Sequence, residues 1–301
     1  MAVPAPLARM GFAALWHPEL IAASLVIAAL YLWAARGVAR RGYTPPTTAQ
    51  RVYFLLGIAL LYLAVGSPLD ALSDNFLFSA HMLEHILIGM AVPPLLLLGL
   101  PDGFWRVLFR QGAIRRTVGF LTRPILALFL FNIAFSVYHF PYLYDLGLYN
   151  GAWHFFEHAV LFVTGLIMWW PIIAPSQELP RISAPAKMVY LFVDAILMTP
   201  VFAVVLFAPK PLYSFYLHVP RLFGLSPLAD QQLGAVIMKL GVLVTYGTAA
   251  GVIFFDWIHK EALRERESML AVYSSDSPEP VRVVRQGDSG KRDPILEREL
   301  S

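Results

Sequence analysis

Two copies of the pattern His-x-x-Glu-His lie within long apolar runs, HMLEH at residues 81–85 and HFFEH at residues 154–158. In a helix, side chains three and four positions apart share a face, so each copy presents two imidazoles and a carboxylate in one direction. Neutral imidazole binds copper, zinc, iron and nickel, and a ligating histidine usually donates its other ring N–H to a carboxylate. The two copies therefore predict the halves of one metal site, in which Glu84 and Glu157 are ligands or orienting groups.

Other side chains could complete this site. His139 closes a further apolar run, and with it the candidate ligands His81, His85, His154 and His158 give five imidazoles, enough for one ion or a close pair. Met238 is the best placed of several methionines that could give a soft donor to Cu(I), although methionine is also common in apolar helices for packing alone. We expect His17, His218 and His259 to be anchors at the membrane interface.

Three other interpretations of the two motifs remain open. Each glutamate could simply accept a hydrogen bond from the histidine of its own motif, which would make a structural network. One histidine from each motif could ligate a haem, with Gly89 and Gly165 leaving room for the flat porphyrin. The pattern is also that of the inverse zincin proteases, but two copies in one chain argue against a single catalytic zinc with one general base.

The composition places these motifs in a membrane. The chain has 301 residues, of which 58% are hydrophobic and only 14% charged, whereas a soluble domain carries about 25% charged residues. There is no cysteine, which excludes thiolate ligands and disulfides. A spanning helix needs roughly 20 apolar residues, and the sequence predicts an all-α bundle of seven such helices: Leu20–Ala35, Val52–Gly66, Phe76–Leu100, Pro124–Tyr138, Trp153–Ile173, Met188–Phe207 and Leu233–Trp257.

The basic residues predict the orientation of this bundle. Most of the 23 Lys and Arg residues follow the first, third, fifth and seventh apolar runs. The positive-inside rule then puts the N-terminus outside and the C-terminus in the cytoplasm, which gathers the histidine motifs at the outer end. The net charge of +3 and the lack of a basic run in the apolar body make nucleic acid an unexpected partner. We expect one membrane domain at 1–270 and a disordered cytoplasmic tail at 271–301.

Between the third and fourth runs, DGFWRVLFRQGAIRRTVGF mixes aromatic residues and arginines at helical spacing, which predicts an amphipathic helix at the interface. Pro93 and Pro94 should kink or break the third helix near its far end. Asp194 is an isolated charge that could bond to Asn132 or to water. Lys239 could pair with one of the motif glutamates.

Taken together, four stretches resemble the seven-helix CtaG-type (caa3-type) cytochrome c oxidase assembly factor family of bacteria. They are HMLEHILIGMAVPPLLLLGLP, HFPYLYD, WHFFEHAVLFVTGLIMWWPI and SPLADQQLGAVIM. The resemblance implies a multi-pass protein of the plasma membrane, not an enzyme, which helps to build a haem-copper oxidase. Its partners would be oxidase subunits and the lipid bilayer. We expect copper to be the cofactor, with haem or zinc as the alternative metals and a metal-free assembly scaffold as the alternative function.

Overall fold

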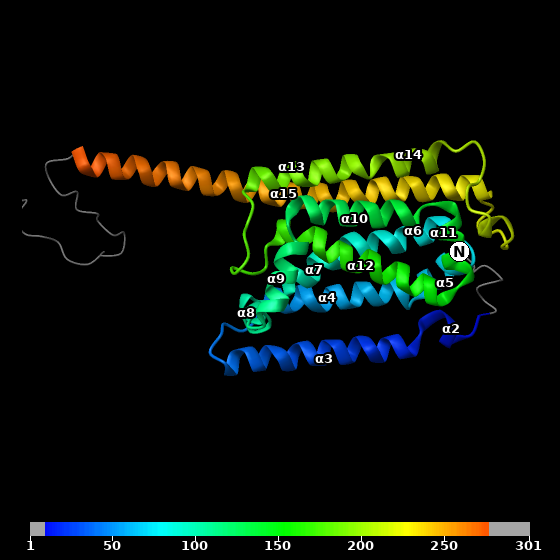
Figure 1. The fold of residues 1–301 in the computed structure, drawn as a ribbon, viewed down its shortest axis with the longest axis horizontal. Coiled ribbons are helices and arrows are strands. Elements are labelled where there is room, and N and C mark those ends of the chain that lie inside the picture. The colour runs from blue at the N-terminus through cyan, green and yellow to red at the C-terminus, as the bar shows by residue number, and fades with distance from the viewer. Residues whose placement is uncertain (1–9, 277–301) are drawn as a thin grey trace, which may run out of the picture. The chain divides into compact units, whose positions relative to one another are not determined.

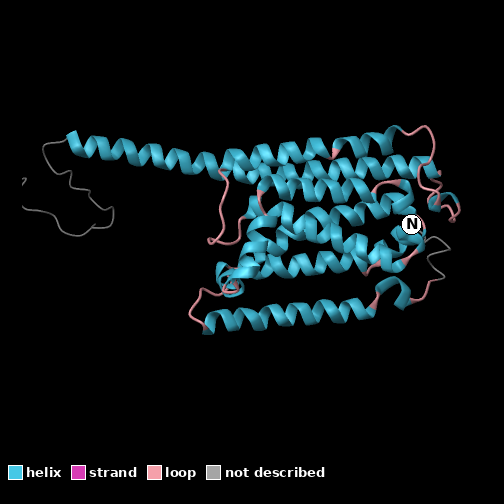
Figure 2. Ribbon diagram, viewed as in Figure 1, coloured by secondary structure: helices cyan, strands magenta, loops and turns pink. Residues whose placement is uncertain are grey.

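The structure is a computed structural model that describes residues 10–276, and every regular element in this range is helical (Figures 1 and 2). The α-helices are α2 (Phe12–Trp16), α3 (Pro18–Arg40), α4 (Thr48–Val65), α5 (Pro68–Asn75), α6 (Phe78–Ile86), α7 (Val92–Gly99), α8 (Asp102–Phe109), α9 (Gly112–Leu121), α10 (Pro124–Tyr138), α11 (Pro141–Tyr149), α12 (Gly151–Ile173), α13 (Ala184–Leu197), α14 (Thr199–Phe207) and α15 (Pro227–Asp276). A π-helix, η1 (Leu87–Ala91), and a 3-10 helix, η2 (Phe215–Leu217), complete the set.

The chain divides into two compact units, at residues 1–254 and 255–301. The first holds the helices up to most of α15, and the second begins within α15, which stays helical through Asp276. Residues 271–276 are thus part of this helix. The rest of the expected tail lies outside the described residues.

The expected multi-span helical architecture is confirmed. Among the described residues, six helices are long and apolar enough to cross a membrane, and a seventh span results if α9 and α10, which meet at 71°, are taken together. α10 has only 15 residues and measures about 22 Å, short of the roughly 30 Å apolar core of a bilayer. The single amphipathic helix expected before it is two helices, α8 and α9.

The third span lies at the centre of the bundle. In this span, Phe78–Gly99, 67% of the residues of its apolar window are buried, against 11% for Phe12–Arg40, which exposes most of its side chains. The first HxxEH motif therefore lies on the most buried of these spans, and the second lies on Gly151–Ile173, whose window is 44% buried. In Figure 1, α5, α6 and α11 lie at the right-hand end of the bundle and α8 and α9 at the left-hand end.

A π-helical turn, not a simple kink, joins the histidine-bearing α6 to α7. Leu87–Ala91 is π-helical and Pro93 is the second residue of α7. Prolines cannot donate to carbonyls of the preceding turn, and a widened turn accommodates those carbonyls without ending the span. Pro93 and Pro94 predicted a break in this span. The irregular turn lies just before them in the sequence, directly after the first HxxEH motif.

The gap expected at Gly89 and Gly165 is filled by helix contact. A Cβ added to Gly165 would collide with the Gly89 carbonyl oxygen, and one added to Gly89 would lie 3.1 Å from Leu161 Cγ. The two glycines therefore allow η1 and α12 to touch, as small residues do in membrane bundles. A porphyrin has no room between them.

Candidate functional site

The five candidate histidine ligands lie close together in one buried cluster. Within the motifs, ring centroids are 4.3 Å apart for His81 and His85 and 4.1 Å apart for His154 and His158. Across the two helices, the His81 ring lies 5.2 Å from His154 and 5.7 Å from His158. The His85 ring is 5.2 Å from that of His158 and 5.8 Å from that of His139. We call these five residues the histidine cluster.

Half of the ring nitrogens in the histidine cluster have no hydrogen-bond partner. Each histidine has a buried nitrogen without a hydrogen bond to any part of the described chain: Nδ1 of His81 and His85, and Nε2 of His139, His154 and His158. Leaving a buried polar atom unsatisfied costs about 1–3 kcal/mol. Five such atoms at one place fit a site built for a ligand that accepts nitrogen lone pairs.

His81 is the common member of the tightest donor groups. Three sets of ligand atoms lie within 4.8 Å of one another: His81 with His154 and His158, His81 with His85 and Glu157, and Asp74 with His81 and Glu84. His81 Nε2 also lies 2.7 Å from His85 Nε2, so the two atoms share at most one proton. His81 is almost fully buried, at 1% exposure.

Each glutamate contacts the other motif rather than its own. Glu84 Oε1 on α6 lies 3.7 Å from His158 Nδ1 on α12, and Glu157 Oε1 on α12 lies 3.7 Å from His85 Nε2 on α6. The alternative in which each glutamate accepts a hydrogen bond from a histidine of its own motif does not occur, because the facing helices bring a ring of the opposite motif closer. Each carboxylate thus faces the other motif, and Oε1 of both glutamates is buried without a hydrogen-bond partner among the described residues.

The short helix α5 adds acidic residues that the motif search missed. Asp74 Oδ2 lies 3.4 Å from His154 Nδ1, and Ser73 Oγ donates a 2.6 Å hydrogen bond to Glu84 Oε2. One turn earlier, burial and the negative charge of Asp74 raise the pKa of Asp70 to about 7, against the opposing charges of His17 and His154. The sequence SPLDALSDN could have indicated these residues, because it forms a short helix capped by Ser67 and carries two acids just before the first motif.

A cavity of about 540 Å³ reaches the histidine cluster from the side of α5. Asp70, Asp74, His154 and His158 line its polar part, and its remaining lining is apolar. His158 and His154 side chains are 12% exposed, more than His81 or His85. The acids therefore flank a route by which a cation could reach the imidazoles.

Three tyrosines cover the histidine cluster on another side. The Tyr144 ring lies 5.1 Å from the His81 ring, and its hydroxyl lies 3.2 Å from that of Tyr216. Tyr213 and Tyr216 come from the loop before α15, and their hydroxyls donate to the His139 and Ser73 carbonyls at 3.1 and 2.9 Å. The loop before α15 is therefore fastened beside the histidine cluster by its tyrosines.

Capping groups fix the two motif helices. Asp230, at the start of α15, accepts hydrogen bonds from the backbone N–H groups of Phe78 and Ser79 at 2.7 and 3.2 Å, which are the first donors of α6. The Asn150 side chain accepts from Ala152 N and Trp153 N, both at 3.1 Å, and so caps α12. Caps of this kind stabilise a helix by about 0.5–2 kcal/mol.

Met238 and Lys239 lie apart from these contacts. Met238 is fully buried in the hydrophobic core, and its role as a ligand stays a prediction. Lys239 Nζ donates to Thr199 Oγ1 at 3.2 Å and lies 5.3 Å from the Phe202 ring centre. Its expected pairing with a motif glutamate does not occur, so it does not compete for those carboxylates.

Asp194 belongs to a separate buried network. It accepts hydrogen bonds from Asn132, as expected, and from the Tyr246 hydroxyl. Tyr190, one turn from Asp194, donates to the Met168 carbonyl at 3.1 Å. Buried polar groups satisfied in this way hold α10, α13, α12 and α15 together.

Comparison with known proteins gives one family and two relatives. The family model described as "Cytochrome c oxidase caa3 assembly factor" matches residues 29–260. "Uncharacterized protein Mb0105" of Mycobacterium bovis and "Uncharacterized protein MT0111" of Mycobacterium tuberculosis are each 29% identical over 252 residues. The alignment covers 74% of this chain but 38% of each relative, so the chain spans less than half the length of these curated relatives. No solved structure matches.

Proposed function

Because the chain belongs to the cytochrome c oxidase caa3 assembly factor family, we propose that it holds a copper ion in the histidine cluster and delivers it to a haem-copper oxidase during assembly. The observation that carries this proposal is the close approach of five imidazole rings from two membrane helices and His139, each with a buried, unpartnered ring nitrogen. We infer the destination of the ion from the family and its binding from the donor atoms.

The donor set suits a transition-metal ion. Imidazole nitrogens bind Cu, Zn, Fe and Ni, and carboxylates near them fix their tautomers and orientation. His81 would be the central ligand, with His85, His154 and His158 around it and His139 as an additional donor. Glu84 and Glu157 would orient the histidines of the facing helix. The ion is cargo, and the protein holds and releases it without itself carrying out a reaction.

The close contact at Gly89 and Gly165 favours a bare ion over haem. Bis-histidine haem needs a flat space between two helices, and here η1 and α12 touch directly below the motifs. Zinc would accept the same donors. The family link to a haem-copper oxidase is what favours copper over zinc.

The acidic cavity beside α5 gives the ion a route in this proposal. Asp70 and Asp74 would attract a cation, and the exposed edges of His154 and His158 would receive it before it passes to the deeper His81. The arginine distribution predicts that this end faces outward, on the side of the bacterial plasma membrane where an oxidase subunit could meet it.

The test is metal analysis of the purified full chain in detergent, with an optical spectrum of the same sample. The chain is loaded with copper and washed, and bound metal is counted by elemental analysis. We expect stoichiometric copper in the wild type, loss of most of it in His81→Ala, and no loss in His218→Ala, a histidine outside the cluster. Copper in all three proteins alike would refute the site.

Two other outcomes would identify the rival functions. A Soret band in the purified protein would indicate haem. A wild-type chain that binds no copper, but still restores oxidase activity to cells that lack the factor, would indicate a metal-free assembly scaffold.

A further inference from the structure

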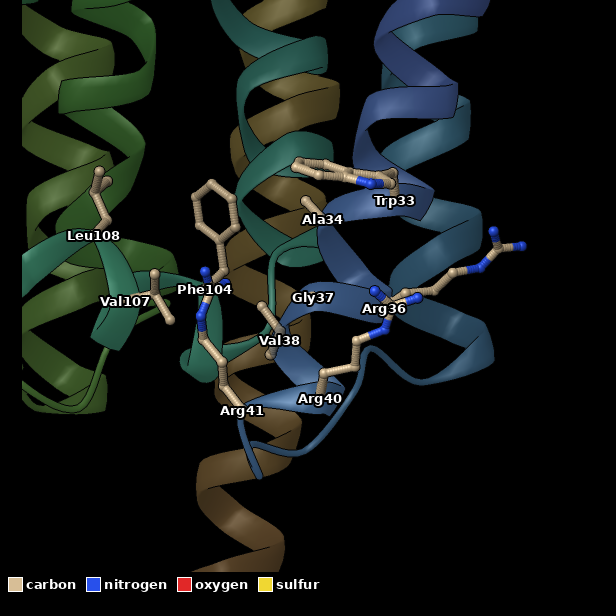
Figure 3. A pocket seen from close by; sticks show the side chains of 10 residues that line it. All are labelled: Trp33, Ala34, Arg36, Gly37, Val38, Arg40, Arg41, Phe104, Val107 and Leu108. Carbon is tan, nitrogen blue, oxygen red and sulfur yellow. The ribbon is translucent and has the colours of Figure 1, made fainter.

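A second cavity lies at the opposite end of the bundle, between the end of α3 and the helix α8 (Figure 3). Its volume is about 460 Å³. One part of its lining is cationic and the other part is apolar; the cationic residues are Arg36, Arg40 and Arg41, and the apolar ones include Trp33, Phe104 and Leu108. No part of this cavity belongs to the histidine cluster.

The three arginines have unused hydrogen-bond donors. No hydrogen bond or ion pair joins Arg36, Arg40 or Arg41 to another side chain of residues 10–276. Their neighbours on α8 differ, because Arg106 pairs with Asp102 and Arg110 donates to the Tyr43 hydroxyl at 3.3 Å. Three guanidinium groups without a carboxylate make this end of α3 a site for an anion.

Of the three arginines, Arg41 extends toward α8, whereas Arg36 extends away from it (Figure 3). In Figure 3, the Arg40 guanidinium lies beside Arg36, and the Arg41 side chain runs toward Phe104. Arg41 Nη1 lies 3.6 Å from the point where a Cβ on Gly37 would be, so the guanidinium packs over Gly37 at ordinary contact distance. An arginine that only interacted with the negative C-terminal end of the α3 helix dipole would not need to extend toward α8, as Arg41 does.

The walls of the cavity are held in place by close packing. A Cβ on Gly103 would lie 2.7 Å from Tyr43 Cβ and 2.9 Å from Val38 Cγ1, so α8 rests directly on the end of α3. Tyr31 adds a hydrogen bond to the Gly99 carbonyl at 2.9 Å and stacks on Phe54 at 3.9 Å. The cavity is therefore preformed by the fold.

A ligand for this cavity must be both anionic and apolar. Trp33 is 69% exposed on α3, and such an aromatic at the cationic end of a span is typical of the level of lipid headgroups. A free anion would use the arginines but leave the apolar wall unused. An anionic phospholipid uses both, and basic pockets between membrane helices on the cytoplasmic side bind such headgroups.

We propose that the cavity between α3 and α8 binds an anionic phospholipid, with the phosphate at Arg41, the positive charges of Arg36 and Arg40 nearby, and an acyl chain along Trp33 and Leu108. The bound lipid ties α3, which buries little of its own surface, to the rest of the bundle. This site does not depend on the copper proposal and can be present whether or not the histidine cluster binds metal.

Native mass spectrometry of the full chain tests the proposal, with phosphatidylglycerol and phosphatidylcholine as the probes. We expect the wild type to retain phosphatidylglycerol in preference to phosphatidylcholine. The double variant Arg40→Gln, Arg41→Gln should bind phosphatidylglycerol roughly tenfold more weakly, because each basic residue near the membrane surface contributes to anionic lipid binding. The matched control is Arg115→Gln, Arg116→Gln on α9, an exposed pair with the same change in charge.

The control pair should leave retention of phosphatidylglycerol unchanged. Equal loss in both double variants would overturn the proposal, since it would indicate general charge attraction. Unchanged binding in the Arg40, Arg41 variant would also overturn it. Millimolar inorganic phosphate should not displace the lipid from the wild type; displacement would indicate a free-anion site instead. All the substituted arginines are exposed, and circular dichroism checks that each variant is folded.

Discussion

Glu84 on α6 lies 3.7 Å from His158 Nδ1 on α12, and the reciprocal contact joins Glu157 to His85 at the same distance. This exchange makes the two HxxEH motifs a single unit. Each motif faces the carboxylate of the other, so we expect removal of a glutamate from one helix to affect the histidines of the other.

Glu84→Gln should weaken copper binding about 10- to 100-fold while the fold is kept, because groups that orient metal-bound histidines have effects of this size. The amide keeps the shape of the carboxylate and can still accept from Ser73, but it removes the negative charge that lies 3.7 Å from His158 Nδ1. Competition with a chelator of known affinity measures the change. Glu178→Gln, at the other end of the bundle, is the control. An unchanged copper affinity in Glu84→Gln would show that Glu84 has no part in metal binding.

Gly147→Ala should disturb the site without removing any candidate ligand. A Cβ at this position would lie 2.7 Å from Glu157 Oε2, so the carboxylate must move away from its place beside His85. Alanine favours a helix by about 1 kcal/mol over glycine, which protects the fold of α11. We expect a lower copper affinity and an unimpaired thermal midpoint.

The control for this substitution is Gly151→Ala, where an added Cβ meets nothing within 4 Å. Both variants change one glycine in helices that line the site. If the two variants bind copper equally well, the position of Glu157 does not matter for binding.

Asp230→Ala should lower both stability and copper affinity. The Asp230 carboxylate caps α6 through Phe78 N and Ser79 N, and its loss leaves buried donors unsatisfied, at a cost of about 1–3 kcal/mol. Because α6 carries His81 and His85, fraying of its first turn also moves ligands. Thermal unfolding and the chelator assay measure the two effects. Asp256→Ala, on the exposed part of α15, should change neither, and an Asp230→Ala protein with wild-type behaviour would contradict the capping role.

Asp70 should make stability depend on pH. Its folded pKa of about 7 is raised from an ordinary value of 3.8, so between these pH values the folded protein binds a proton that the unfolded chain releases. Asp70 therefore stabilises the fold least at high pH, and its contribution is lost as the pH rises from about 4 to about 7.

Asp70→Asn removes this dependence. The thermal midpoint of the variant should rise relative to the wild type as the pH increases through that window, and the difference should level off above pH 7. Asp256→Asn, an exposed carboxylate, serves as the control. A difference between Asp70→Asn and wild type that stays constant with pH would contradict the raised pKa.

Helical spacing alone predicted much of this arrangement. Positions 81, 84 and 85 must share a face of a helix, and polar faces in apolar spans turn toward each other. The structure places the rings of the two motifs within contact, with His139 beside them. The all-helical, multi-span fold followed from composition in the same way.

The exchange of glutamates between the motifs could not be predicted, because it depends on how far α6 is shifted along α12. The contacts of Asp74 and Ser73 with the motifs could not be predicted from the sequence for a related reason. They lie in a short helix whose relation to α6 is set by a turn and not by any period in the sequence. Asp230 is 152 residues along the chain from Phe78, whose N–H it accepts, and no local pattern connects them.

The π turn at Leu87–Ala91 has a consequence for how the third span tolerates change in length. Each residue of a helix rotates the following side chains by about 100°, so the wide turn sets the angular phase between the prolines below it and the imidazoles above. Deleting one residue there would rotate HMLEH away from α12, while the part of the span around Leu96 kept its packing. The histidines therefore face α12 only if the number of residues in this turn is kept. Hydrophobicity alone does not fix that rotational register.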